Sequence, residues 1–285
     1  VTQEVLFSRF QILTFCFVAL LITFPRGSAA QNTKSYFRRM LGIDSNIMSS
    51  FTSTYNTFAW GRVGGGSGLG SSIQFTRPLR TVLLKFFEDN KIKSMYDVPC
   101  GAMLWTKIFL QDVRKQIPEF VYEGVDVVKK VVDANQRHFT EDPKTTIRHG
   151  DFVNEPVPKG FDLIFSRDAL QHLTYAQVIK ALQNFAESDA RFVVVGTYPK
   201  GKNINLPQAG TNCFEINLQA HPFNLEPDQV LPESERWHIR YGGHKHLAVF
   251  SSGKLAQVDW KRLEADAGLN SAQAPSKMSS GEREI

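Results

Sequence analysis

Three short segments constrain the fold of this chain most strongly. Each is a run of apolar residues that ends on an acidic or polar group, and they lie at 95–101, 122–126 and 161–168. Buried parallel strands have this pattern when their carboxyl ends open into a ligand crevice. The segments therefore predict a parallel sheet whose strand ends form a binding site.

Strand and helix patterns alternate through the middle of the chain. The predicted strands lie at 94–98, 120–125, 145–150, 161–166, 191–197 and 246–250. The last of them can run antiparallel. The predicted helices lie at 78–90, 102–116, 129–138 and 175–187, and Thr174 and Gln177 have capping-box spacing before the fourth. This alternation predicts an α/β fold with a doubly wound, mostly parallel sheet and helices on both faces.

The turn after the first predicted strand suits a small polar or anionic ligand. Pro99 and Gly101 let the backbone turn tightly and approach a ligand closely, just before a helix begins. Asp126 follows Gly101 by 25 residues, which is close to where a neighbouring strand delivers an acid to a ribose. The sequence therefore predicts a cofactor that contains a nucleoside.

Taken together, these residues resemble the class I, Rossmann-like S-adenosylmethionine-dependent methyltransferases. The resemblance covers residues 60 to 250 and rests on Asp-x-Pro-Cys-Gly at 97–101, on Asp126, on Gly-Asp at 150–151 and on the segment 161–168. Within that family, Asp-x-Pro-Cys-Gly with Trp105, Ser-Arg-Asp-Ala-Leu-Gln-His-Leu at 166–173 and Phe-Thr-x-Pro-Leu-Arg at 75–80 look like a little-characterised branch. The chain departs from the family's usual Gly-x-Gly at 99–101, and it has Ala102 where the branch has an acid.

The resemblance implies S-adenosylmethionine as the cofactor. It implies that Asp97 meets the positively charged amino or sulfonium end, that Asp126 accepts from both ribose hydroxyls, and that Asp151 and Phe152 contact the adenine. The predicted cofactor-binding residues are Asp97, Pro99, Cys100, Gly101, Trp105, Asp126, Val127, Asp151, Phe152 and Ser166.

The predicted catalytic residues follow the fourth strand, where the methyl group is handed over. Asp168 can act as a base or can hold Arg167 in an ion pair. His172 shares a face with Asp168 if the segment is helical, and it is then a candidate base for a hydroxyl acceptor. The alternative is that His172 only caps the turn before the next helix. No metal is predicted, because the chain has no Cys-x-x-Cys and no acid completes a ligand set around the histidines at 244 and 246.

A glycine-rich segment at 61–72 imitates a nucleotide-binding loop. It does not follow an apolar strand, which the loop requires, so we interpret it as a lid over the crevice or as a plain linker. The sequence thus predicts a helical and glycine-rich lid region at 31–93, a methyltransferase core at 94–252 and a disordered tail at 268–285.

The amino-terminal region carries an apolar run at 10–24. This run indicates a signal peptide or signal anchor within residues 1–30, and hence a secretory or membrane-anchored protein with a glycan or small-molecule acceptor. The alternative is a buried helix of a cytoplasmic protein. The net charge of +5 comes from scattered Lys and Arg side chains, which does not favour a nucleic-acid partner.

The sequence therefore predicts S-adenosylmethionine-dependent methyl transfer to an unidentified acceptor, with a hydroxyl group among the candidates. Two alternatives stay open. One is a catalytically inactive binding protein with this fold, which Ala102 and the missing glycines allow. The other is a nicotinamide-dependent oxidoreductase, which would need Gly-x-Gly-x-x-Gly after the first strand.

Overall fold

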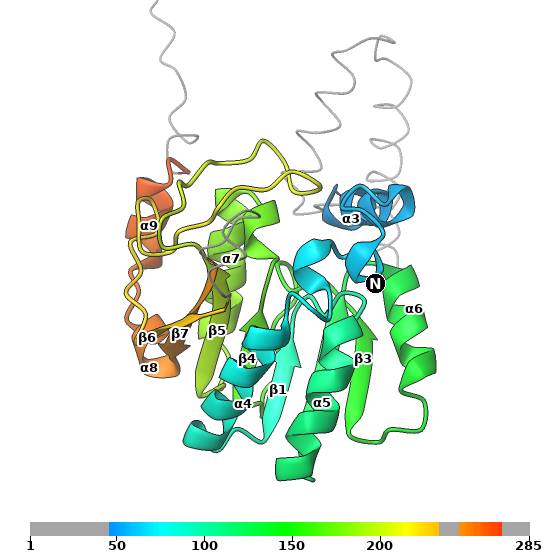
Figure 1. Ribbon diagram of the computed structural model, residues 1–285. Coiled ribbons are helices and arrows are strands. Elements are labelled where there is room, and N and C mark those ends of the chain that lie inside the picture. The colour runs from blue at the N-terminus through cyan, green and yellow to red at the C-terminus, as the bar shows by residue number, and fades with distance from the viewer. Residues whose placement is uncertain (1–45, 234–244, 270–285) are drawn as a thin grey trace, which may run out of the picture. The chain divides into compact units, whose positions relative to one another are not determined.

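A mostly parallel sheet forms the centre of the protein (Figure 1). The computed structural model describes residues 46–233 and 245–269, and the seven strands of that part form one sheet. The strands are β1 (Ser94–Asp97), β2 (Val121–Asp126), β3 (Thr145–His149), β4 (Leu163–Ser166), β5 (Phe192–Thr197), β6 (Gln229–Pro232) and β7 (His246–Ser251).

The strand order places a ligand site between β1 and β4. The order is β3-β2-β1-β4-β5-β7-β6, with β1 to β5 parallel and β7 antiparallel to both of its neighbours. The order therefore runs outward from β1 in one direction and outward from β4 in the other. Open α/β sheets bind ligands at such a switch point, outside the carboxyl ends of the strands.

Helices cover both faces of this sheet. The helices are α3 (Asn46–Thr57), α4 (Arg77–Asn90), α5 (Leu104–Gln116), α6 (Lys129–His138), α7 (Tyr175–Ala186), α8 (Ser252–Ala256) and α9 (Trp260–Asp266). Along β4, Leu163 and Phe165 point into a core shared with α4 and α5, whereas Ile164 points into a core shared with α7 and α9. This alternation explains why β4 is apolar on both faces.

The structure confirms the predicted fold and shows where the sequence placed boundaries wrongly. α6 coincides with the predicted helix, and Thr174 and Gln177 form the predicted capping box. The helix predicted from residue 102 begins instead at Leu104. Gly101 and Met103 have φ values of 58° and 53°, so the chain turns through the left-handed region before the helix starts.

The glycine-rich segment lies outside the sheet. It forms two short 3₁₀ turns, η1 (Val63–Gly66) and η2 (Leu69–Ser71), and the structure places no strand between residues 46 and 93. The region predicted at 31–93 is described from residue 46 onward, and there it holds α3, both turns and α4.

The predicted signal peptide or anchor at 1–30 lies outside the described residues, as does the predicted tail from residue 270 onward. Across 46–233 and 245–269, the helices are too short or too polar for any of them to span a bilayer.

Candidate active site

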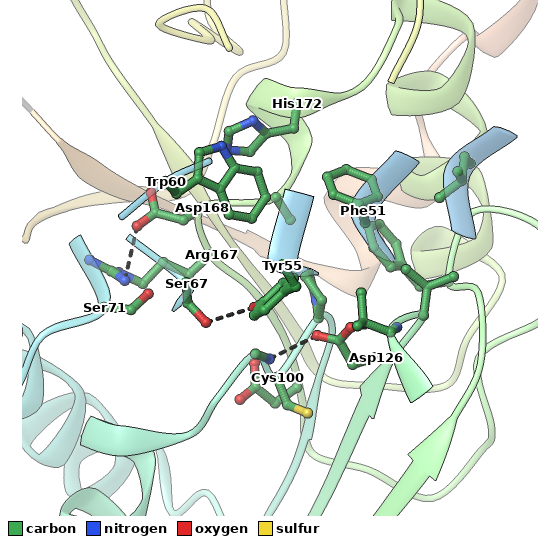
Figure 2. A pocket seen from close by; sticks show the side chains of 18 of the residues that line it. Phe51, Tyr55, Trp60, Ser67, Ser71, Cys100, Asp126, Arg167, Asp168 and His172 are labelled. Atoms are coloured by element: carbon green, nitrogen blue, oxygen red, sulfur yellow. Dashed lines mark hydrogen bonds and ion pairs between the residues drawn. The ribbon is translucent and has the colours of Figure 1, made fainter. Parts of the chain in front are cut away.

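A cavity opens at the carboxyl ends of β1, β2 and β4 (Figure 2). It brings together nine of the ten predicted cofactor-binding residues: Asp97, Pro99, Cys100, Gly101, Trp105, Asp126, Val127, Asp151 and Phe152. The three catalytic candidates, Arg167, Asp168 and His172, line it as well. Ser166 does not line the cavity. Its side chain is buried at the end of β4, and its Oγ has no hydrogen-bond partner among the described residues.

The turn after β1 is held against the end of β2. The backbone N–H of Cys100 donates to the carbonyl of Val125 at 2.9 Å, and that of Gly101 donates to Oδ2 of Asp126 at 3.0 Å. Gly101 has a φ of 58°, and a Cβ added there would lie 3.0 Å from Oγ of Ser67. A glycine is needed because the backbone is left-handed and another segment approaches it closely.

Asp126 is buried but keeps capacity to accept further hydrogen bonds. Its Oδ1 accepts from the backbone N–H of Val128 at 2.8 Å, and its Oδ2 accepts from that of Gly101. Burial raises the pKa of this carboxyl to about 6, although the backbone donors oppose the shift. Each carboxylate oxygen has a second lone pair, so two hydroxyl groups of a ligand can still be bound.

Asp97 lies beside Asp126 at the same end of the cavity. Its Oδ2 accepts from the hydroxyl of Tyr122 at 2.6 Å. Burial, and to a smaller extent the nearby charge of Asp126, raise the pKa of Asp97 to about 7, although the hydrogen bond from Tyr122 opposes the shift. Two buried carboxyl groups this close favour a positively charged ligand group, because a cation stabilises their ionised forms.

The glycine-rich segment packs directly on the turn after β1. Oγ of Ser67 accepts from the backbone N–H of Ala102 at 3.1 Å and lies 2.6 Å from the hydroxyl of Tyr55. A Cβ added at Gly65 would lie 2.7 Å from Cβ of Ala102. The segment therefore covers one side of the cavity and packs closely against Ala102.

Arg167 and Asp168 belong to a buried cluster of four charged side chains. Nη1 of Arg167 lies 3.0 Å from Oδ2 of Asp168, and its Nε donates to Oε1 of Glu233 at 2.9 Å. Lys245 pairs with the other oxygen of Asp168, and Nη2 of Arg167 donates to the carbonyl of Gly70 at 2.9 Å. The structure thus shows the ion pair, which was one of the two predicted roles of Asp168.

The charges of this cluster make Asp168 a weak base. Burial alone would raise its pKa, but Arg167 and Lys245 hold the pKa well below its ordinary value. The carboxylate therefore stays ionised and binds protons poorly near neutral pH.

His172 is oriented by the backbone and not by Asp168. The segment Leu170–His172 is a single 3₁₀ turn, η3, so the helical face expected to join Asp168 and His172 does not form. The ring's Nδ1 lies 3.0 Å from the carbonyl oxygen of Asn212. Because a carbonyl only accepts, Nδ1 carries the proton and Nε2 carries a lone pair. Burial lowers the pKa of this imidazole, which keeps it neutral.

Several cavity residues were not predicted from the sequence. Phe51 and Tyr55 come from α3, and Trp60 follows it, with ring centroids 5.9 Å apart for Tyr55 and Trp60. Glu233 and Lys245 complete the charged cluster from residues far along the chain. The sequence predicted a helical region there, but no local pattern indicated which surface its aromatic side chains would cover.

In the described ranges, His, Cys, Asp and Glu side chains do not gather in groups of three or more that could hold a metal ion.

Residues 96–194 match a protein family described as a methyltransferase domain. No curated protein sequence matches the chain.

Solved structures with a similar arrangement include PigF with SAH, at 13% identity and a TM-score of 0.47, which covers 62% of this chain and 56% of that chain. Human N-acetylserotonin methyltransferase in complex with SAM is 15% identical with a TM-score of 0.46, covering 75% of this chain and 61% of that chain. The methyltransferase domain of bacterial CtHen1-CN is 18% identical with a TM-score of 0.46. The match covers 61% of this chain and 98% of that chain. The chain thus spans little more than half of PigF. Residues 96–194 thus match a methyltransferase domain, and the strands of the described residues have a Rossmann-like order.

Proposed function

We propose that this enzyme transfers the methyl group of S-adenosylmethionine to a hydroxyl group of its acceptor, and that His172 accepts the hydroxyl proton. One observation carries the proposal. A single cavity is lined both by the two carboxyl groups at the ends of β1 and β2 and by an imidazole whose Nε2 holds a lone pair.

The residues at the strand ends fit the cofactor. Asp126 offers two acceptor oxygens to the ribose hydroxyls, and Asp97 offers negative charge to the amino or sulfonium end. At the proposed adenine end, the ring of Phe152 stacks on that of Phe185 with centroids 6.0 Å apart. Asp151 already accepts from Val153, so its contact with the adenine amino group would use a second lone pair.

When bound, S-adenosylmethionine supplies a methyl group on a positively charged sulfur. The acceptor oxygen forms a bond to the methyl carbon while the carbon–sulfur bond breaks, and its electron pair stays on sulfur. The hydroxyl proton moves to Nε2 of His172. The side chains serve mainly to align the reacting atoms, since an in-line displacement needs orientation and the removal of one proton.

The proposal is tested in two steps on the full chain. Calorimetric titration with S-adenosylmethionine, S-adenosylhomocysteine and NAD⁺ should give saturable binding of the first two and none of the third. Incubation with methyl-labelled S-adenosylmethionine and matched sets of alcohols, amines and carboxylates should then place the label on oxygen of an alcohol. Transfer of the label to nitrogen or to a carboxylate would contradict the hydroxyl assignment.

A further inference from the structure

The cavity has an aromatic roof, which we define as the rings of Phe51, Trp60 and His172. The centroids of Trp60 and His172 are 4.7 Å apart, and those of Phe51 and Trp60 are 6.0 Å apart. The Phe51 ring stands nearly perpendicular to the His172 ring, at 88°. Figure 2 shows these three rings on the side of the cavity away from Cys100. The roof therefore lies across the cavity from the turn after β1.

Hydrogen bonds to the backbone already occupy polar atoms of the roof. Nε1 of Trp60 donates to the carbonyl of Thr211 at 3.0 Å, and Nδ1 of His172 donates to that of Asn212. The neighbouring Tyr55 hydroxyl is bonded to Ser67. A sugar needs several polar partners for its hydroxyls, whereas Phe51 and Trp60 line the cavity with mainly apolar ring surface.

The charges beside the roof cancel each other. Arg167 and Asp168 line the cavity there, and Glu233 and Lys245 complete a buried cluster of two positive and two negative groups. Each charge of the cluster already has an oppositely charged partner. An acceptor with its own charge would lose its hydration here without gaining a partner, so the site favours a neutral molecule.

From these contacts we propose that the acceptor is a neutral, flat aromatic alcohol that packs against the aromatic roof with its hydroxyl toward Nε2 of His172. This inference rests on the proposed function, because it assigns the acceptor of the same reaction. The aromatic roof binds the ring, and His172 binds and deprotonates the hydroxyl.

The test compares three probes by calorimetry on the full chain, both alone and saturated with S-adenosylhomocysteine. The probes are 2-naphthol, 2-naphthoate, which has the same rings with a negative charge, and methyl β-glucoside, which is neutral but not aromatic. We expect 2-naphthol to bind at least about tenfold more tightly than either comparator. Equal or tighter binding of the naphthoate or of the glucoside would overturn the inference.

Variants of the roof give a second measurement. Trp60→Leu and Phe51→Leu should each weaken 2-naphthol binding about tenfold, and by more than they weaken S-adenosylhomocysteine binding. Trp260→Leu, a change on α9 outside the cavity, is the matched control and should leave both affinities as they are. Unchanged naphthol binding in Trp60→Leu would also overturn the inference. A wild-type protein that binds 2-naphthol but not S-adenosylhomocysteine would instead refute the proposed function.

Discussion

The floor and the roof of the cavity are built in different ways. The floor consists of Asp97 and Asp126, which end the neighbouring strands β1 and β2, and of Gly101, whose backbone N–H donates to Asp126. The roof consists of rings from α3, the turn after it and η3, held by carbonyls at 211 and 212. The residues proposed to bind the cofactor are therefore set by short local sequence patterns at the strand ends. The chemistry of the acceptor depends on packing between distant segments.

The largest expected effect comes from the floor. Asp126→Ala should weaken S-adenosylhomocysteine binding at least about a hundredfold, because two charge-assisted hydrogen bonds of roughly 1.5–3 kcal/mol each would be lost. Calorimetry measures this directly. Binding of 2-naphthol to the roof should be affected far less, which would separate the two ends of the cavity.

A matched control guards against simple unfolding of the Asp126 variant. Asp133 is a carboxylate on α6 that pairs with Lys129 at 2.7 Å and does not line the cavity. Asp133→Ala should bind S-adenosylhomocysteine as the wild type does. If both variants lose binding equally, or if neither does, Asp126 is not the ribose acceptor.

The next effect belongs to the roof. His172→Ala should lower the turnover of a hydroxyl acceptor by at least about tenfold, within reach of the roughly 10²- to 10⁴-fold typical of a general base. Affinity for S-adenosylhomocysteine should change little. His138, an exposed imidazole at the end of α6, provides the control His138→Ala. If His172→Ala keeps the turnover of the wild type, a group other than His172 accepts the hydroxyl proton.

The pH dependence of binding should also differ between floor and roof. The raised pKa values of Asp97, about 7, and of Asp126, about 6, mean that both carboxyl groups gain protons as the pH falls through this range. A cationic donor and ribose hydroxyls prefer the ionised forms, so affinity for S-adenosylmethionine should fall about tenfold from pH 8 to pH 6.

Two comparisons sharpen that result. Asp97→Asn should flatten the upper part of the profile, because the amide side chain of this variant cannot titrate. Binding of 2-naphthol should stay constant over the same range, since burial keeps His172 neutral by lowering its pKa. If the affinity for S-adenosylmethionine instead rises as the pH falls, the proposed roles of Asp97 and Asp126 are contradicted.

The smallest effect concerns the glycine-rich segment. Gly65 and Gly61 both have positive φ, 70° and 84°, so alanine is strained at either position. A Cβ at Gly65 would also meet Ala102, whereas a Cβ at Gly61 meets nothing within 4 Å. If the segment is a lid, Gly65→Ala should weaken S-adenosylhomocysteine binding several-fold more than Gly61→Ala does. Equal effects would favour a plain linker.

Most of the fold and the floor could be predicted from the sequence. The capping box of α7 and the acidic strand ends at Asp97 and Asp126 are local patterns, and parallel strands bring such ends together. The sequence allowed Asp168 and His172 to share a face if the segment were helical, but the chain forms a 3₁₀ turn there.

The roof and the charged cluster beside it could not be predicted because their partners are remote. Trp60 is held by a carbonyl 151 residues away, and Arg167 pairs with Glu233, which is 66 residues away. Neither contact leaves a periodic or spaced signal in the sequence. Ser166 was placed at the cofactor because it ends β4, but it is buried and does not line the cavity.

A crystal structure of the full chain with S-adenosylhomocysteine would test the central claim most directly. The account predicts that both ribose hydroxyls lie within hydrogen-bond distance of the Asp126 carboxylate, with the amino acid end toward Asp97 and the sulfur on the side of His172. A nucleoside bound against the glycine-rich segment at 64–70, with Asp126 still contacting only the backbone of Gly101 and Val128, would contradict it.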